Sequence, residues 1–99
     1  MTKEQSIELR RALFRWSADN AMPRIATGGY STDFAYGGQY IGERSLRIEF
    51  YGERDKYAVE ARIFDEHMQC GDSRREAITT TERLIELLNW VNEDLPKQA

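Results

Sequence analysis

The stretch SLRIEFYGERDKYAVEARIF, residues 45–64, constrains the fold more than any other part of the chain. Apolar and polar side chains alternate along both of its arms, which is the period of a β-strand with one buried face. The segment GERD, residues 52–55, separates the arms and is rich in turn-forming residue types. We therefore predict an antiparallel hairpin with a four-residue loop.

A four-residue loop decides which residues of the two arms lie opposite each other. The apolar pairs are Phe50 with Tyr57, Ile48 with Val59 and Leu46 with Ala61. The same register sets Arg47 opposite Glu60 on the other face, which is a complementary cross-strand pair. Because the apolar and the charged pairs select one register, the hairpin should have a core face and a polar face.

The preceding stretch YSTDFAYGGQYIGE, residues 30–43, predicts a second hairpin. A two-residue turn at Gly37 and Gly38 uses the positive φ angles that glycine adopts easily. The resulting pairs are Tyr36 with Gln39, Ala35 with Tyr40 and Phe34 with Ile41. Phe34 then belongs to the core face, with Tyr30 and Tyr36 at its parity, whereas Tyr40 points outward. A weaker alternation at residues 65–78 suggests an edge strand, with its turn at Gly71 and Asp72.

Helices are predicted at both ends of the chain. The first begins with a Thr-x-x-Gln capping box at Thr2 and runs to about residue 20. Its apolar stripe is Leu9, Ala12, Leu13 and Trp16, widened by Ile7 and Phe14. The second begins with a capping box from Thr79 to Glu82 and ends before Pro96. Its stripe is Leu84, Ile85, Leu87, Leu88, Val91 and Leu95, flanked by Trp90.

These elements predict a single α+β domain over residues 1–99, in which an N-terminal and a C-terminal helix bracket a three- or four-stranded antiparallel sheet. A chain of 99 residues has material for one hydrophobic core. Two amphipathic helices can both pack on the apolar face of such a sheet. The other face of the sheet is then open and is the candidate binding surface.

The predicted open face mixes aromatic and charged side chains. By strand parity it carries Asp33, Ala35, Tyr40, Arg47, Glu49, Tyr51, Ala58, Glu60, Arg62 and Phe64. Tyrosine and arginine are enriched at the centres of protein interfaces. We expect Tyr40, Tyr51 and Phe64 to anchor a partner, and Arg47, Glu49, Glu60 and Arg62 to orient it. The alternative is that scattered aromatic residues belong to an ordinary surface, or that one helix crosses that side of the sheet.

No catalytic or metal-binding pattern is predicted, and no cofactor is expected. His67 and Cys70 could form the start of a nucleophilic site, but the sequence specifies no orienting third group. Glu43, Asp65 and Glu66 have no metal-ligand spacing. We therefore expect a protein that is not an enzyme.

Charge and hydropathy limit the partners. Seventeen acidic against fourteen basic residues give a net charge of −3, which favours a protein partner over a phosphate backbone. No signal-peptide core and no run of roughly 20 apolar residues is present, so we expect no membrane association and a cytoplasmic location. The single cysteine, Cys70, cannot form an internal disulfide.

In overall build, the meander SLRIEFYGERDKYAVEARIF followed by the helix TTTERLIELLNWV resembles small inhibitors encoded by phages and mobile elements, anti-CRISPR proteins among them. The resemblance implies a non-enzymatic protein that occludes a site on a larger host or defence complex. Toxin-immunity proteins share this build. Two alternatives stay open: a single-stranded nucleic-acid binder that stacks bases on Tyr51 and Phe64 beside Arg47 and Arg62, and a homodimer.

Overall fold

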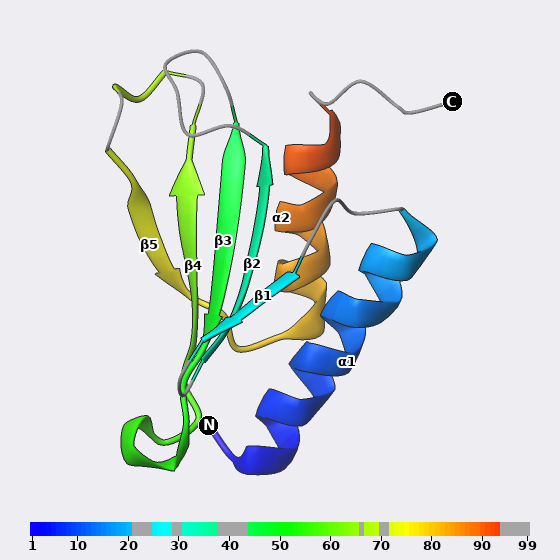
Figure 1. The fold of residues 1–99 in the computed structure, drawn as a ribbon, viewed down its shortest axis with the longest axis vertical. Helices are drawn as coiled ribbons and strands as arrows, with labels where there is room; N and C mark the ends of the chain where they lie inside the picture. Colours follow the sequence, from blue (N-terminus) through cyan, green and yellow to red (C-terminus); the bar gives the residue numbers. More distant parts are fainter. Residues whose placement is uncertain (21–24, 29–30, 38–43, 66, 70–71, 94–99) are drawn as a thin grey trace.

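The computed structural model describes residues 1–20, 25–28, 31–37, 44–65, 67–69 and 72–93, and within 25–37 the backbone alone. The elements are α1 (Lys3–Asp19), β1 (Ile25–Gly28), β2 (Ser31–Gly37), β3 (Ser45–Phe50), the 3₁₀ turn η1 (Glu53–Asp55), β4 (Val59–Phe64), β5 (Arg74–Ala77) and α2 (Thr81–Glu93). The strands form one antiparallel sheet in the order β1-β2-β3-β4-β5. Both helices lie on the same side of it (Figure 1). The predicted α+β arrangement of helix, antiparallel sheet and helix is confirmed.

Helix α1 begins with the predicted capping box. The Gln5 amide donates to Thr2 Oγ1 over 3.1 Å, and the Thr2 amide donates to Gln5 Oε1 over 2.9 Å. Leu9, Leu13 and Trp16 are buried, as the periodicity predicts. Phe14 was expected to widen this stripe, but 42% of it is exposed, because its position lies outside the narrow face that α1 buries.

Helix α2 begins one residue later than predicted. Thr80, not Thr79, is the cap, because its Oγ1 accepts a hydrogen bond from the Arg83 amide over 3.2 Å. The prediction of a capping box from Thr79 to Glu82 was therefore wrong by one position. The buried face of α2 is Leu84, Leu87, Leu88 and Val91, and the partly buried Ile85 and Trp90 pack against it. Leu95 lies outside the described residues.

The core lies between the two helices and one face of the sheet. The strands contribute Leu46, Ile48, Phe50, Val59, Ala61 and Ile63, each at most 2% exposed. The helices are also joined by a polar contact, in which the Trp16 indole Nε1 donates to Asn89 Oδ1 over 2.9 Å. This bond gives the buried indole the partner that a tryptophan N–H needs inside a protein.

The β3–β4 hairpin has a different register from the predicted one. Its pairs are Phe50 with Val59, Ile48 with Ala61, Leu46 with Ile63, Arg47 with Arg62 and Glu49 with Glu60. The loop is longer because η1 is followed by left-handed backbone at Lys56 (φ 53°) and Tyr57 (φ 56°). The amides of Asp55 and Tyr57 both donate to the Gly52 carbonyl. A shift of two residues preserves strand parity, so the predicted core and polar faces of β3 and β4 are confirmed.

The predicted turn at Gly37 and Gly38 is wrong. Gly37 belongs to β2 and pairs with Ser45, and Phe34 pairs with Ile48 rather than with Ile41. The predicted partners Gln39, Tyr40 and Ile41 lie outside the described residues. Strands β2 and β3 pair over five residue positions, from Asp33 with Glu49 to Gly37 with Ser45. A tight turn at Gly37 would instead pair β2 with the residues that directly follow it.

The sheet has a strand at each edge that is only four residues long. Strand β1 was not predicted, because a four-residue segment that ends in glycine has no clear alternation. With β1 the sheet has five strands, so the predicted number of three or four was too low. The predicted edge strand between residues 65 and 78 is confirmed as β5, where Arg75 pairs with Arg62 and Ala77 with Glu60. In the described part of the chain, no helix is long and apolar enough to cross a membrane.

Candidate protein-binding face

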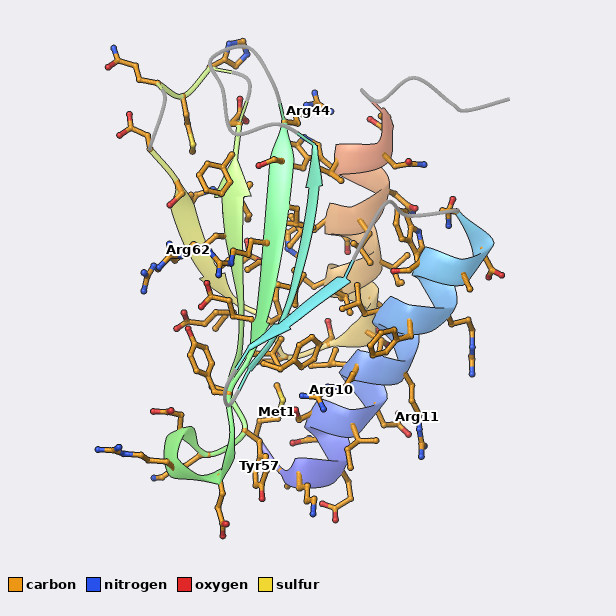
Figure 2. The ribbon with its side chains drawn as sticks, viewed as in Figure 1. Met1, Arg10, Arg11, Arg44, Tyr57 and Arg62 are labelled. Carbon is orange, nitrogen blue, oxygen red and sulfur yellow. The ribbon has the colours of Figure 1, made fainter. Side chains whose placement is uncertain are left out.

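The side of the sheet away from the helices carries a cluster of charged side chains. We call it the open face and define it by Arg47, Glu49, Tyr51, Ala58, Glu60, Arg62, Phe64 and Arg75. In Figure 2, Arg62 lies on this side, whereas Arg10 and Arg44 lie toward the helices. The members on β3 and β4 are partly exposed and alternate with buried core residues. Alternation along the strands therefore creates this face.

The register sorts these charges into two rows that run across the strands. Arg47, Arg62 and Arg75 are successive Cα partners on β3, β4 and β5 and form a basic row. Glu49 and Glu60 are Cα partners and form an acidic row beside it. The predicted pairing of Arg47 with Glu60 is wrong, because the longer loop moves each residue to a partner of like charge. Like charges directly opposite each other destabilise a sheet, so each row needs compensation from outside itself.

Glu49 provides this compensation because it belongs to the acidic row and forms ion pairs with two arginines of the basic row. Its Oε1 lies 3.6 Å from Arg47 Nε and 3.4 Å from Arg62 Nε. The Glu49 side chain is only 12% exposed, whereas the two arginines are 39% and 33% exposed. One shielded carboxylate therefore holds two arginines that still face the solvent.

Tyr51 is also held by this acidic row. Its hydroxyl donates to Glu49 Oε2 and lies 3.4 Å from Glu60 Oε2. The hydrogen bond to Glu49, followed by burial and the two negative charges, raises the pKa of Tyr51 to about 12. Tyr51 is therefore a neutral phenol whose O–H already donates to Glu49, so its ring is the main part that can contact a partner.

The two other predicted aromatic anchors differ from Tyr51. Phe64 is half-buried at the far end of β4 and has Ser45 as its Cα partner. Tyr40 lies outside the described residues. The structure thus groups Arg47, Glu49, Tyr51, Glu60 and Arg62 closely, with Phe64 at one end of the face.

Sequence reasoning missed the part of the open face near the β3–β4 turn. A depression of about 470 Å³ is lined by Tyr51, Arg54, Asp55, Lys56, Ala58, Glu60 and Arg75. Arg75 belongs to it because β5 pairs with β4, and the weak alternation around Arg74 and Glu76 was the only signal for that strand. The predicted loop contained Arg54 and Asp55 but not Lys56, which the predicted register placed in the second arm of the hairpin.

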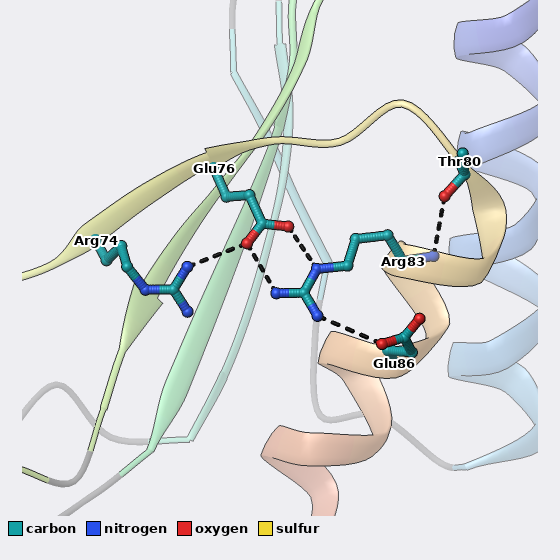
Figure 3. A network of polar contacts seen from close by, with 5 residues as sticks. All are labelled: Arg74, Glu76, Thr80, Arg83 and Glu86. Atoms are coloured by element: carbon teal, nitrogen blue, oxygen red, sulfur yellow. Dashed lines mark hydrogen bonds and ion pairs between the residues drawn. The ribbon is translucent and has the colours of Figure 1, made fainter.

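Edge strand β5 is fixed to helix α2 by a group of ion pairs (Figure 3). The Arg83 guanidinium donates to both oxygens of Glu76, through Nε to Oε2 and through Nη2 to Oε1 over 2.8 Å. Arg74 Nη1 also donates to Glu76 Oε1, over 3.1 Å. These hydrogen bonds, those from Arg83 foremost, lower the pKa of Glu76 to about 2. The strand that carries Arg75 therefore has a fixed position.

The described residues offer no metal centre. No group of three or more His, Cys, Asp or Glu side chains within them could hold a metal ion. In the 65–69 segment, the His67 amide donates to Asp65 Oδ1 over 3.0 Å, and the Met68 amide donates to the Asp65 carbonyl. Cys70, Glu43 and Glu66 lie outside the described residues.

Searches with this chain matched no protein-family model, no curated protein sequence and no solved structure. The fold and its site define an α+β domain in which two helices cover one face of a meander and the other face presents two rows of opposite charge.

Proposed function

We propose that this chain is a non-enzymatic protein-binding domain that attaches to its partner through the open face. The observation that carries the proposal is the pair of charged rows on a sheet face that neither helix covers. Side chains held in place before binding lose less conformational entropy on association. Glu49 and Tyr51 hold the arginines and each other in this way.

Two parallel rows of opposite charge give a binding surface an orientation. A partner with the complementary pattern is attracted in one direction and repelled when turned by half a revolution. Specificity and association rate would come mainly from the rows, and affinity from the areas of Tyr51 and Phe64 that become buried. A nucleic-acid backbone would meet the acidic row beside the basic one, which disfavours it.

The narrower role within this proposal is that of an inhibitor of the anti-CRISPR type or a toxin-immunity protein. Its support is the small helix–sheet–helix build with one sheet face that neither helix covers. Such a domain would act by steric cover of a site on a larger complex rather than by chemistry.

The test is an affinity capture from the lysate of the source cell, divided into nuclease-treated and untreated halves, using the tagged wild type and two variants. The face variant carries Arg47→Ala and Phe64→Ala, and the control variant carries Arg11→Ala and Arg15→Ala on the exposed side of α1. Arg11 points away from the sheet (Figure 2). We expect a stoichiometric protein that the wild type and the control retain and the face variant loses.

The affinity for the captured protein should fall at least about tenfold in the face variant, as for interface anchors. Circular dichroism and thermal unfolding would verify that both variants are folded. Equal retention by both variants would contradict the proposal, because the binding surface would then lie elsewhere. Loss of all captured material on nuclease treatment would instead support the nucleic-acid alternative.

A further inference from the structure

The depression at the β3–β4 turn differs from the rest of the open face in its uncompensated positive charge. Among the described residues, Arg47 and Arg62 pair with Glu49, whereas Arg74 and Arg83 pair with Glu76. The cations in the lining of the depression are Arg54, Lys56 and Arg75. None of these three has an ion pair or hydrogen bond from its side chain to another described residue.

These three cations come from two elements that the chain brings together. Arg54 and Lys56 belong to the turn, and Arg75 belongs to edge strand β5. All three are exposed, so their charges are solvated in the free protein. The lining also contains Asp55 and Glu60, which leaves one net positive charge in a chain whose net charge is −3.

We propose that this depression receives an acidic segment of the protein partner, with an Asp or Glu side chain between Arg75 and the turn cations. The inference rests on the proposed function and specifies the chemistry of the partner. Arginine suits this role because its planar guanidinium can donate two hydrogen bonds to one carboxylate.

The mixed lining favours a peptide over a nucleic acid. Asp55 and Glu60 would repel a continuous phosphate chain, which offers acceptors and negative charge at every step. A peptide instead offers backbone N–H donors next to its acidic side chains, and the two lining carboxylates can accept from them. Tyr51 forms a neutral part of the wall, because its hydroxyl already donates to Glu49.

The experiment is an NMR titration of the isotopically labelled protein with an oligoglutamate peptide at low salt. An oligoglutamine peptide of the same length is the uncharged control, and oligothymidylate is the nucleic-acid probe. We expect oligoglutamate to shift the amides of residues 54–58 and of Arg75, and oligoglutamine to shift none. The shifts should diminish as salt is added, because exposed charges are screened over about 10 Å at 0.1 M salt.

The matched variants carry equal changes of charge. Arg54→Glu with Arg75→Glu reverses two cations of the depression, and Arg11→Glu with Arg15→Glu reverses two on α1. We expect the first to lower the affinity for oligoglutamate at least tenfold and the second to change it less than threefold. The milder Arg75→Gln should lower it severalfold, and it provides the same test if the charge reversal prevents folding.

Three results would overturn the inference. They are equal losses in the two double variants, shifts located away from the turn and β5, and binding of oligothymidylate as tight as that of oligoglutamate. Failure here is separable from failure of the proposed function. A captured partner whose binding depends on Arg47 and Phe64 but not on Arg54 and Arg75 would support the open face as the binding surface. The same result would contradict the binding of an acidic segment in the depression.

Discussion

At the scale of single residues, Glu76 is the described carboxylate whose pKa is shifted furthest by its neighbours. It accepts hydrogen bonds from two arginines and connects strand β5 to helix α2. Its side chain is 24% exposed, so solvent screens the pair only in part. The bidentate geometry makes this contact stronger than an ordinary surface ion pair.

Glu76 should make the stability of the protein sensitive to acid. Its pKa is about 2 in the folded protein and near 4.5 ordinarily, so the ionised form is favoured by folding. This contribution is fully present above pH 4.5 and is lost as the pH falls toward 2. We expect Glu76→Gln to lower the free energy of unfolding by about 1–2 kcal/mol at pH 7.

Urea unfolding at pH 7 and pH 3 would measure this effect. Glu76→Gln should lose less stability between the two pH values than the wild type does. Glu86→Gln is the control, because Glu86 is exposed and lies 3.5 Å from Arg83. An identical pH response in the wild type and Glu76→Gln would contradict the assignment.

Tyr51 should make the stability of the protein sensitive to alkaline pH, whereas Glu76 makes it sensitive to acid. The pKa of Tyr51 is raised from 10 to about 12, so the neutral phenol is favoured by folding. The stability that it contributes is present below pH 10 and is lost as the pH rises toward 12. The ultraviolet difference between the wild type and Tyr51→Phe should therefore show a phenol that ionises near pH 12. A midpoint near 10 would mean that the bond to Glu49 does not persist in solution.

At the scale of elements, the two neighbouring threonines at the start of α2 differ in their roles, because Thr80 caps the helix and Thr79 does not. Thr80→Ala should destabilise the protein by about 1 kcal/mol, because it removes the acceptor for the Arg83 amide. Thr79→Ala should change stability by less than about 0.5 kcal/mol, as for an exposed residue outside the cap. Thermal unfolding of both variants would compare them, and a larger effect at Thr79 would support the cap that the sequence alone suggested.

The β3–β4 turn contains avoidable backbone strain at Lys56. Its φ of 53° is left-handed, which costs a residue with a Cβ roughly 1 kcal/mol relative to glycine. We expect Lys56→Gly to be more stable than Lys56→Ala by about this amount. Both variants remove the same charge, so their difference in urea midpoint isolates the backbone. Equal midpoints would show that the turn has another conformation in solution.

Periodicity predicted which face of each strand is buried better than it predicted which residues pair across neighbouring strands. Alternation placed Leu46, Ile48 and Phe50 in the core because a period of two decides the side of a strand. It could not decide the register, because left-handed backbone at Lys56 and Tyr57 leaves no glycine signal in the sequence. The two adjacent threonines before α2, Thr79 and Thr80, likewise offered two possible caps, and Glu82 favoured Thr79 in the sequence.

At the scale of the whole molecule, the candidate site was only half predictable. The residues on β3 and β4 followed from parity, which a two-residue shift leaves unchanged. The two charge rows did not, because they depend on the register of three strands. Arg75 enters the site only through the pairing of β5 with β4, which a short and weakly alternating strand does not reveal.

The meander and the two helices also have a consequence for the order of folding. Each strand pairs with its neighbour in sequence, so the sheet can grow through short loop closures. The Trp16–Asn89 bond instead joins residues 73 positions apart. We expect this helix–helix contact to form after the rate-limiting step, so Asn89→Ala should accelerate unfolding and hardly change the folding rate. Stopped-flow chevron plots would measure both limbs, and a slower folding limb would place the docking of the two chain ends in the folding nucleus.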